Sequence, residues 1–248
     1  MKEPKIGSLA KAMKVLECFK ANPELGVTDI SEQLGLFKSN VYDILSTFRS
    51  LGYVAQNEKN GKYHLGYKVL ELSHVITAFM GFRKTVYPQM QKLAQEAGET
   101  VYLAIPDGLD VLYLDAAYPG HAYTTRSMLG ERAPMYCTGI GKAILSRMDE
   151  ALWRRAAEQE LTAFTDNTIK DPEDLIRELM LTRERGYSVD NMEHEHGVKC
   201  VGVAVLNDMK QSVAGISVSG PSPRFDAEKI DDFAKRLSNI AATIGIYF

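Results

Sequence analysis

The sequence contains few cysteines and no long apolar run. Its 248 residues include three cysteines, Cys18, Cys137 and Cys200, which lie far apart and form no CxxC pair. An odd number of widely spaced cysteines argues against a disulfide framework or a zinc knuckle and fits a reducing compartment. No apolar run approaches the ~20 residues of a membrane span, and no signal-like apolar stretch follows residues 1–4. We therefore expect a cytoplasmic protein with no membrane partner.

The sequence also lacks an overall excess of positive charge, because its formal net charge is −3. The distribution is uneven, however. Residues 1–68 carry ten Lys and Arg against seven Asp and Glu, whereas residues 69–248 carry 19 against 25. A basic first part followed by an acidic second part is expected if only the first part meets phosphate. Because the basic surplus is small, nonspecific affinity for DNA should be modest and steeply salt dependent.

Residues 27–54 predict two short helices joined by a tight turn. The first helix has its apolar residues on one face, and Thr28 or Asp29 can cap its start. Gly35 follows, where the chain needs a residue that tolerates positive φ to leave the helix. This arrangement is typical of a helix-turn-helix DNA reader, but it equally fits an ordinary corner between two helices.

The second of these helices is the candidate recognition helix. We expect Ser39 to cap it, and its apolar face to consist of Val41, Ile44, Leu45, Phe48 and Leu51. Short polar side chains remain on the outer face, which suits the donors and acceptors of the major groove. The candidate DNA contacts on this helix are Lys38, Ser39, Asn40, Tyr42, Asp43, Thr47 and Arg49.

A short hairpin is predicted directly after the recognition helix. Residues 53–55 and 62–65 alternate as strands on either side of a turn that contains Asn60-Gly61. A hairpin in this position is the wing of a winged helix, and Lys59 and Lys62 at its tip suit contacts with DNA phosphates. Two motifs in the right order make DNA binding the leading interpretation.

Helices are also predicted on both sides of this motif. The helix over residues 8–21 should bury Leu9, Met13 and Leu16, with Val15 and Phe19 as further candidates. Residues 67–80 predict another helix, with too much apolar surface for a solvated linker. Its apolar residues are Val69, Leu70, Leu72, Val75, Ile76 and Phe79.

From residue 83 the pattern changes to mixed helices and strands. We expect strands at 99–105, 111–117, 123–127, 187–191, 198–206 and 213–219. Helices are expected at 85–97, 139–148, 149–159, from Asp171 to Gly186, and 226–244. Helices at both ends with strands between them predict an antiparallel sheet flanked by helices, an α+β fold.

Three polar stretches of the second part could converge on a ligand pocket. They are the Gly-rich turn at 138–142, the segment 190–200, and the pair Ser217 and Ser219. Residues 217 and 219 share one face of a strand, and two hydroxyls beside a helix N-terminus suit a carboxylate. The alternative is that both serines face solvent, and the pattern alone favours neither interpretation.

The remaining reactive side chains do not predict catalysis or a metal site. His194-Glu195-His196 lacks the HExxH spacing and offers two ligands at most on one side. None of the cysteines lies in a recognisable His-partnered motif. An enzyme with an accessory helical domain would need a nucleophile–base pair or three metal ligands, so we expect neither catalytic residues nor a cofactor.

Blocks along almost the whole chain resemble the IclR family of bacterial transcriptional regulators. In the first part these are SLAKAMKVLECF (8–19), TDISEQLGLFKSNVYDIL (28–45), LGYVAQ (51–56) and KYHLGYKVLEL (62–72). In the second part they are MYCTGIGKAIL (135–145), DNMEHEHGVKCVGVAV (190–205) and GISVSGP (215–221). Any one block is weak evidence, but the blocks together and in order are specific.

The resemblance implies three regions. Residues 1–66 would form a winged helix-turn-helix DNA-binding domain, and residues 67–81 a linker helix that packs against a sister subunit. A helix buried within its own subunit is the alternative for the linker. Residues 82–248 would form a GAF-like or PAS-like effector-binding and oligomerisation domain. The implied assembly is a homodimer or a dimer of dimers on double-stranded operator DNA.

The resemblance also implies an effector, a small carboxylate such as a keto acid, a sugar acid or an aromatic acid. The positions that match the family's effector site are Gly139, Ile140, Asp190, Cys200, Ser217 and Ser219, with Met135 and Val198 as apolar wall. Repression relieved by a metabolite is the commoner theme of the family. Activation of a catabolic operon and a ligand-free architectural role are the alternatives.

Two residues depart from the family pattern in the DNA-binding part. Phe37 stands where the family usually has Pro, and its ring is free to pack against the first helix. Asp43 stands where the family usually has Arg in the recognition helix. An acid in the major groove accepts from cytosine N4, so we expect an operator preference unlike that of typical relatives.

Overall fold

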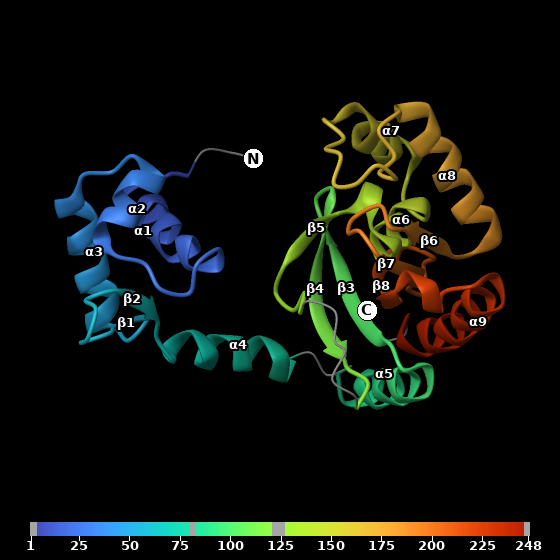
Figure 1. Cartoon of the computed structure of the whole chain (residues 1–248), viewed down its shortest axis with the longest axis horizontal. Coiled ribbons are helices and arrows are strands. Elements are labelled where there is room, and N and C mark those ends of the chain that lie inside the picture. The colour runs from blue at the N-terminus through green and yellow to red at the C-terminus, as the bar shows by residue number, and fades with distance from the viewer. Residues whose placement is uncertain (1–3, 80–82, 121–126, 246–248) are drawn as a thin grey trace. The chain divides into compact units, whose positions relative to one another are not determined.

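The computed structural model describes residues 4–79, 83–120 and 127–245. The chain divides into two compact units, Met1–Met80 and Gly81–Phe248 (Figure 1). None of the helices in the described ranges is long and apolar enough to span a bilayer.

The first unit is a small helical domain with a two-stranded hairpin. Its elements are α1 (Gly7–Glu17), η1 (Cys18–Lys20), α2 (Val27–Leu34), α3 (Lys38–Ser50), β1 (Val54–Gln56), β2 (Tyr63–Leu65) and α4 (Lys68–Phe79). Val15, Ile30, Val41 and Leu45 are fully buried at its centre, so α1, α2 and α3 share one core. Gly35 ends α2 with φ of 62°, as the turn requires.

Several local predictions for the first unit are wrong. Ser39 does not cap α3, because the helix begins at Lys38, two residues earlier than that cap implies, and Phe37 stands at its N-cap without a side-chain hydrogen bond. Leu9 and Met13 are exposed, because α1 turns Val15 toward the core and leaves these two on another side. Leu51 is also exposed, at the C-terminal end of α3.

The second unit is an antiparallel sheet with helices on both faces. Its strands are β3 (Thr100–Asp107), β4 (Asp110–Ala117), β5 (Arg132–Pro134), β6 (Ser188–Asn191), β7 (Val198–Leu206) and β8 (Ser212–Pro221). Among the described residues the strand order is β5-β4-β3-β8-β7-β6, with every pairing antiparallel. The α+β prediction is therefore confirmed. The short strand β5 was not predicted, and the strand predicted at 123–127 lies, apart from Ser127, outside the described residues.

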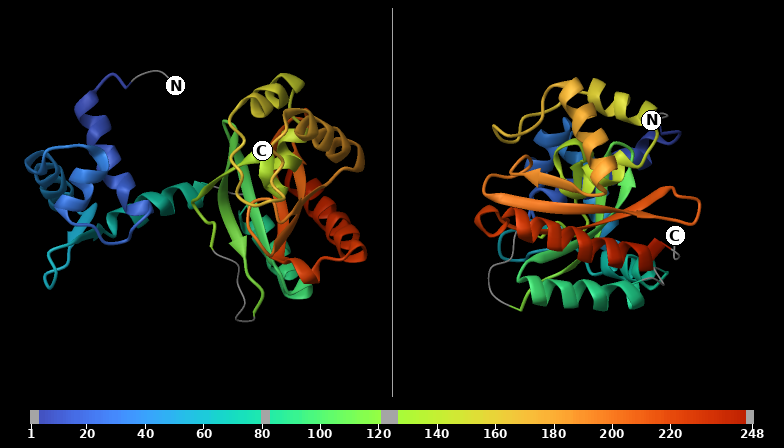
Figure 2. Two further views of the ribbon diagram at one scale, coloured as in Figure 1. Left: turned by 45° about the horizontal axis from the view of Figure 1, so that its top comes forward. Right: turned by 90° about the vertical axis from the view of Figure 1, so that its right-hand side faces the viewer.

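The helices of the second unit form two layers. The helices α5 (Arg83–Ala97) and α9 (Ala227–Ile244) pack on one face of the sheet (Figure 2). On the other face, α6 (Gly139–Ser146) packs directly on β7 and β8. The helices α7 (Glu150–Glu158) and α8 (Pro172–Arg185) pack against α6. The start of α6 therefore lies over the middle of the sheet.

Candidate functional site

The outer face of α3 presents the predicted DNA contacts to solvent. Lys38, Ser39, Asn40, Tyr42, Asp43, Thr47 and Arg49 are all exposed. Two of them already have partners within the unit, because Thr47 Oγ1 donates to the carbonyl of Asp43 (2.8 Å) and Arg49 donates to Gln56 (2.8 Å). Phe37 is 80% exposed beside this face, so the prediction that its ring packs against the first helix is wrong.

The wing, residues 54–65, is fixed by a residue outside it. The Glu24 carboxylate accepts from the side-chain amides of Asn57 (3.0 Å) and Asn60 (3.1 Å). These two hydrogen bonds lower the pKa of Glu24. The amide oxygens of the same asparagines accept from the backbone N–H groups of Lys59 and Lys62, the predicted phosphate contacts. Glu24 therefore orders the turn that carries both lysines, a role that sequence patterns did not indicate because the partners are more than 30 residues away.

A small cavity lies in the second unit where the start of α6 faces the sheet. Its volume is about 40 Å³. The lining residues are Tyr102, Tyr113, Met128, Thr138, Gly139, Ile140, Asp190, His194, Glu195, Val198, Cys200, Ser217 and Ser219. The three polar stretches singled out in the sequence therefore meet at one place. Of the predicted effector contacts, Met135 is not among the lining residues.

Met135 lies beneath the cavity instead. It belongs to the single turn η2 (Met135–Cys137) that precedes α6, and it is fully buried in the apolar core. The first turn of α6 rests on it, because a Cβ added at Gly141 would come within 2.5 Å of Met135 Cα. Met135 thus supports the Gly-rich turn and does not line the cavity in this structure.

The two serines point into the molecule. Ser217 and Ser219 are 2% and 5% exposed in the central strand β8, so the alternative that they face solvent is wrong. In register, Ser217 is paired with Tyr102 of β3, and Ser219 with Cys200 of β7. The Ser219 hydroxyl lies close enough to the Cys200 thiol to oppose part of the rise in its pKa. The cavity therefore contains a group of neutral hydrogen-bonding side chains on neighbouring strands.

The backbone at the start of α6 lies in close contact with strand β7. A Cβ added at Gly139 would lie 2.9 Å from Cys200 Cβ, and one added at Gly202 would lie 2.4 Å from the Gly139 carbonyl oxygen. Thr138 caps the helix, with its hydroxyl accepting from the N–H of Gly141 (3.2 Å). The first N–H groups of a helix have no partner within it, so those of Gly139 and Ile140 can bind an anion.

One acidic side chain lies deep in the cavity. Asp190 is 3% exposed, and its Oδ1 accepts from the backbone N–H of Glu193 (2.6 Å). Burial, together with the nearby charge of Glu193, raises the pKa of Asp190 to about 7. None of the described residues that line the cavity is Lys or Arg. An anionic ligand therefore meets hydroxyls, backbone amides and the partly protonated carboxyl group of Asp190, with His194 and the exposed Glu195 also in the lining.

Sequence reasoning missed two tyrosines on this wall. The rings of Tyr102 and Tyr113 pack edge to face with centroids 5.3 Å apart. Burial raises the pKa of Tyr113 well above its ordinary value, so its phenol stays neutral and can donate. The two tyrosines meet because β3 pairs with both β4 and β8. The alternation of apolar and polar residues along one strand does not reveal which strands pair.

Two thiols and a histidine are the other reactive groups near the cavity among the described residues. Burial raises the pKa values of the Cys137 and Cys200 thiols well above the ordinary range, which keeps both thiols protonated and poorly nucleophilic. The His194 ring packs against Phe164 (5.1 Å between centroids). Within the described ranges, no three His, Cys, Asp or Glu side chains are grouped to hold a metal ion.

Comparison with known proteins matches both units to one family. The model of the bacterial transcriptional regulator IclR C-terminal domain matches residues 74–246, and the IclR helix-turn-helix domain matches residues 8–58. The HTH-type transcriptional regulator XynR of Escherichia coli is 34% identical over 94% of each chain. KdgR of the same organism is 32% identical, covering 96% of this chain and 91% of the relative.

Solved structures agree over nearly the full length. The IclR structure from Thermotoga maritima has a TM-score of 0.78 at 32% identity and covers 96% of this chain and 97% of that chain. An IclR homologue from Microbacterium hydrocarbonoxydans, complexed with 4-hydroxybenzoate, has a TM-score of 0.84 at 21% identity, with 97% and 98% covered. At that identity the second likeness supports the fold alone.

Proposed function

Because this chain belongs to the IclR family of bacterial transcriptional regulators, we propose that it is an operator-binding repressor whose DNA binding is relieved by a small carboxylate. The observation that carries the proposal is the cavity of the second unit, where buried hydroxyls and a helix start converge without any lysine or arginine among the described lining residues. Such a site binds an anion through neutral donors, which suits reversible sensing of a metabolite. Relatives named as repressors, including the transcriptional repressor IclR of Escherichia coli, support the sign of regulation.

The effector contacts in this proposal are seven of the eight positions suggested by the sequence. Ser217, Ser219 and the amides of Gly139 and Ile140 hold the carboxylate, and Cys200 and Val198 complete the wall. Asp190 accepts from a hydroxyl of the ligand or, when protonated, donates to its carboxylate. A cavity of about 40 Å³ holds only a few water molecules. In this conformation the cavity therefore favours a short keto acid. A sugar acid or an aromatic acid is larger, so the side chains that line the cavity would have to move to admit it.

The DNA contacts in this proposal lie on α3 and the wing. Ser39, Asn40 and Asp43 face base edges, and the lysines at positions 38, 59 and 62 contact phosphates. Phe37 is a further candidate, because an exposed ring at this position suits contact with a thymine methyl group. The operator lies in the cytoplasm of a bacterium, which is where we place the protein.

We further propose that α4 pairs two subunits. Its side chains Leu70, Leu72, Val75 and Ile76 are all exposed, which is unusual for a helix of twelve residues. Contiguous apolar surface of this kind marks an interface between chains. The resulting organisation is a DNA-binding domain at 1–66, a linker helix at 67–81 and an effector domain at 82–248, assembled as a dimer or a dimer of dimers.

The ligand part of this proposal is tested by thermal-shift screening of the full-length protein against keto acids, sugar acids and aromatic acids. A bound acid raises stability by RT ln(1 + [L]/Kd), about 2.7 kcal/mol at a hundredfold excess over Kd. The shift should disappear in Ser217→Ala/Ser219→Ala and persist in Ser212→Ala. Ser212 is a matched control, because its hydroxyl is buried in the same strand without a hydrogen-bond partner among the described residues and lies outside the cavity.

The DNA part is tested by selecting operator sequences with the full-length protein and measuring affinity by mobility shift. Asn40→Ala should weaken binding to the selected site, whereas Lys20→Ala, on η1, should not. The effective acid should then release the DNA. Selection of DNA with no response to any acid would instead support the architectural role, and tighter DNA binding with the acid would contradict repression relieved by the ligand.

A further inference from the structure

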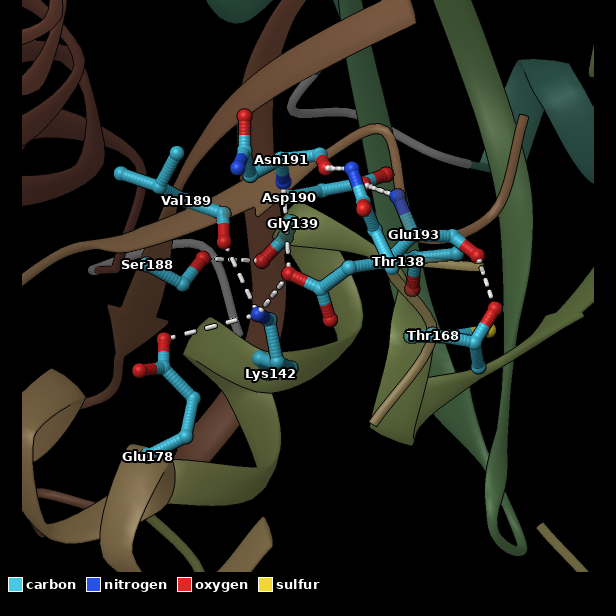
Figure 3. A network of polar contacts seen from close by, with 12 residues as sticks. Thr138, Gly139, Lys142, Thr168, Glu178, Ser188, Val189, Asp190, Asn191 and Glu193 are labelled. Atoms are coloured by element: carbon cyan, nitrogen blue, oxygen red, sulfur yellow. Dashed lines mark hydrogen bonds and ion pairs between the residues drawn. The ribbon is translucent and has the colours of Figure 1, made fainter. Parts of the chain in front are cut away.

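A lysine side chain is fully buried beside the cavity. Lys142, in the first turns of α6, is 1% exposed. Its ammonium group donates to Glu193 Oε1 (2.6 Å), to the carbonyl of Val189 (2.8 Å) and to Glu178 Oε1 (3.4 Å) (Figure 3). The three N–H donors of the lysine are thus matched by three acceptors, two of them carboxylates. A charge this deep is tolerated only with such partners.

The partners of Lys142 flank the buried acid of the cavity. Val189 directly precedes Asp190, and Glu193 follows it by three residues. Ser188 adds a further connection, because its hydroxyl donates to the carbonyl of Gly139 at the start of α6 (Figure 3). Residues 190–198, which we call the 190–198 segment, carry Asp190, His194, Glu195 and Val198 into the cavity lining. Lys142 therefore ties the start of α6 to the segment that joins β6 and β7 and lines the cavity beside it.

The loop between α7 and α8 holds the same segment from another side. Thr165 Oγ1 donates to the carbonyl of Met192 (2.6 Å), and Thr168 Oγ1 donates to the carbonyl of Glu193 (2.6 Å). Met192 itself has φ of 61°, a conformation that costs free energy for a residue with a side chain. The path of the segment is thus strained and is fixed by side chains from separate parts of the chain.

We propose that the Lys142–Glu193 pair is a positioning element, which holds the 190–198 segment against the start of α6 and so keeps Asp190 in line with Cys200 and Ser219 on the neighbouring strands. This inference rests on the proposed function of the cavity. Stability alone is a poor reason for such a pair, because well-packed apolar residues of similar volume usually serve as well or better. Glu193 Oε2 also has no hydrogen-bond partner among the described residues, a cost that the pair does not relieve.

The accessibility of Cys200 tests this inference without a ligand. Cys200 lines the cavity, whereas Cys18 and Cys137 are buried elsewhere in the core. The full-length protein is treated with methyl methanethiosulfonate, a small neutral thiol reagent, and modification of each cysteine is followed by peptide mass spectrometry. The rate at Cys200 then reports how often the 190–198 segment opens.

The decisive variant is Lys142→Met/Glu193→Met, which removes both charges together. It should keep a Tm close to that of the wild type, while Cys200 reacts about tenfold faster or more because the segment opens more often. Arg236→Met/Glu96→Met is the matched control, since it removes an ion pair between α9 and α5 on the other face of the sheet. That control should leave the Cys200 rate unchanged.

A second variant covers the case in which the double methionine protein does not fold. Glu193→Gln keeps the shape and an acceptor for Lys142, and its Cys200 rate should lie between those of the wild type and the open state. If the folded variants react at the wild-type rate, the pair is only structural and the inference is wrong. An acid that stabilises the wild type should also lose its effect in the double variant. If none of the acids stabilises the wild type, the proposed function fails while the Cys200 rates still decide this inference.

Discussion

The pKa of Asp190 makes effector binding depend on pH in a definite direction. Burial raises this pKa from 3.8 to about 7. A carboxylate ligand is repelled by the ionised side chain and accepts a hydrogen bond from the protonated one. If only the protonated form binds, affinity follows the protonated fraction of Asp190. That fraction falls from about 0.9 at pH 6 to about 0.1 at pH 8, so binding should weaken about tenfold over this range.

The same pKa predicts how the stability of the free protein depends on pH. Because the folded-state pKa of Asp190 lies above its unfolded value, the folded protein binds more protons than the unfolded chain between about pH 4 and pH 7. The contribution of this residue to the free energy of unfolding is therefore largest below pH 4 and decreases as pH rises through 7. In Asp190→Asn this contribution to the pH dependence should be absent.

Titration calorimetry at pH 6, 7 and 8, with the acid found by the thermal-shift screen, tests the binding prediction. At pH 7 binding should take up about half a proton, which is measured by repeating the titration in buffers of different ionisation enthalpy. Asp190→Asn should bind with nearly constant affinity and, at pH 8, more tightly than the wild type. His194→Gln is the necessary control, because His194 also lines the cavity and carries an ionisable ring. A pH dependence that survives Asp190→Asn and disappears in His194→Gln would refute the assignment.

Three further variants test other parts of the structure. Glu24→Ala should weaken operator binding a few-fold at unchanged Tm, because the free wing must then be ordered on the DNA; mobility shift measures this. Trp153→Phe should lower the free energy of unfolding, measured in urea, by about 2–4 kcal/mol. The substitution removes the hydrogen bond from the indole N–H to the Leu145 carbonyl (2.6 Å) and weakens the contact of the ring with the Arg183 guanidinium (4.1 Å). Asp43→Arg should change the selected operator sequence and steepen the salt dependence of binding by about one unit of slope.

Each of these variants also has a result that would contradict its reasoning. Full operator affinity in Glu24→Ala would mean that the wing binds DNA equally well without its hydrogen bonds to Glu24. Lys20→Ala controls for a general effect of charge. A loss below about 0.5 kcal/mol in Trp153→Phe means that the buried hydrogen bond is replaced by another. An unchanged operator sequence in Asp43→Arg means that residue 43 does not read bases.

Local patterns predicted the elements of this chain better than the side-chain positions. The two helices around Gly35 and the wing follow from apolar spacing and turn residues, which act over a few positions. Ser39 is not the cap because the extended backbone at Phe37 starts the helix two residues earlier. Leu9 and Met13 were placed inside because α1 has apolar residues on more than one side, and spacing does not choose between them.

The candidate site was predictable only in part, for a similar reason. Asp190, Ser217 and Ser219 were found because they belong to recognisable blocks of sequence. Lys142 lies in one of those blocks, but a lysine on a helix is expected to reach solvent. Its burial depends on Glu178 and Glu193, which lie 36 and 51 positions away. Contacts between residues so far apart in the sequence arise from the packing of α6 on the sheet. No short sequence pattern predicts them.

The contact between Gly139 and Gly202 limits how effector specificity can change in proteins of this design. A Cβ on Gly202 would overlap the backbone of Gly139, and a Cβ on Gly139 would press against Cys200, so any larger residue at either position displaces α6 from the sheet. The cavity therefore cannot be enlarged from this side by substitution. New ligand preferences must arise at the opposite side, where Met128, His194 and Val198 line the same space with side chains that can be exchanged. Divergence in ligand choice should accordingly be concentrated there, while the pair of glycines stays fixed.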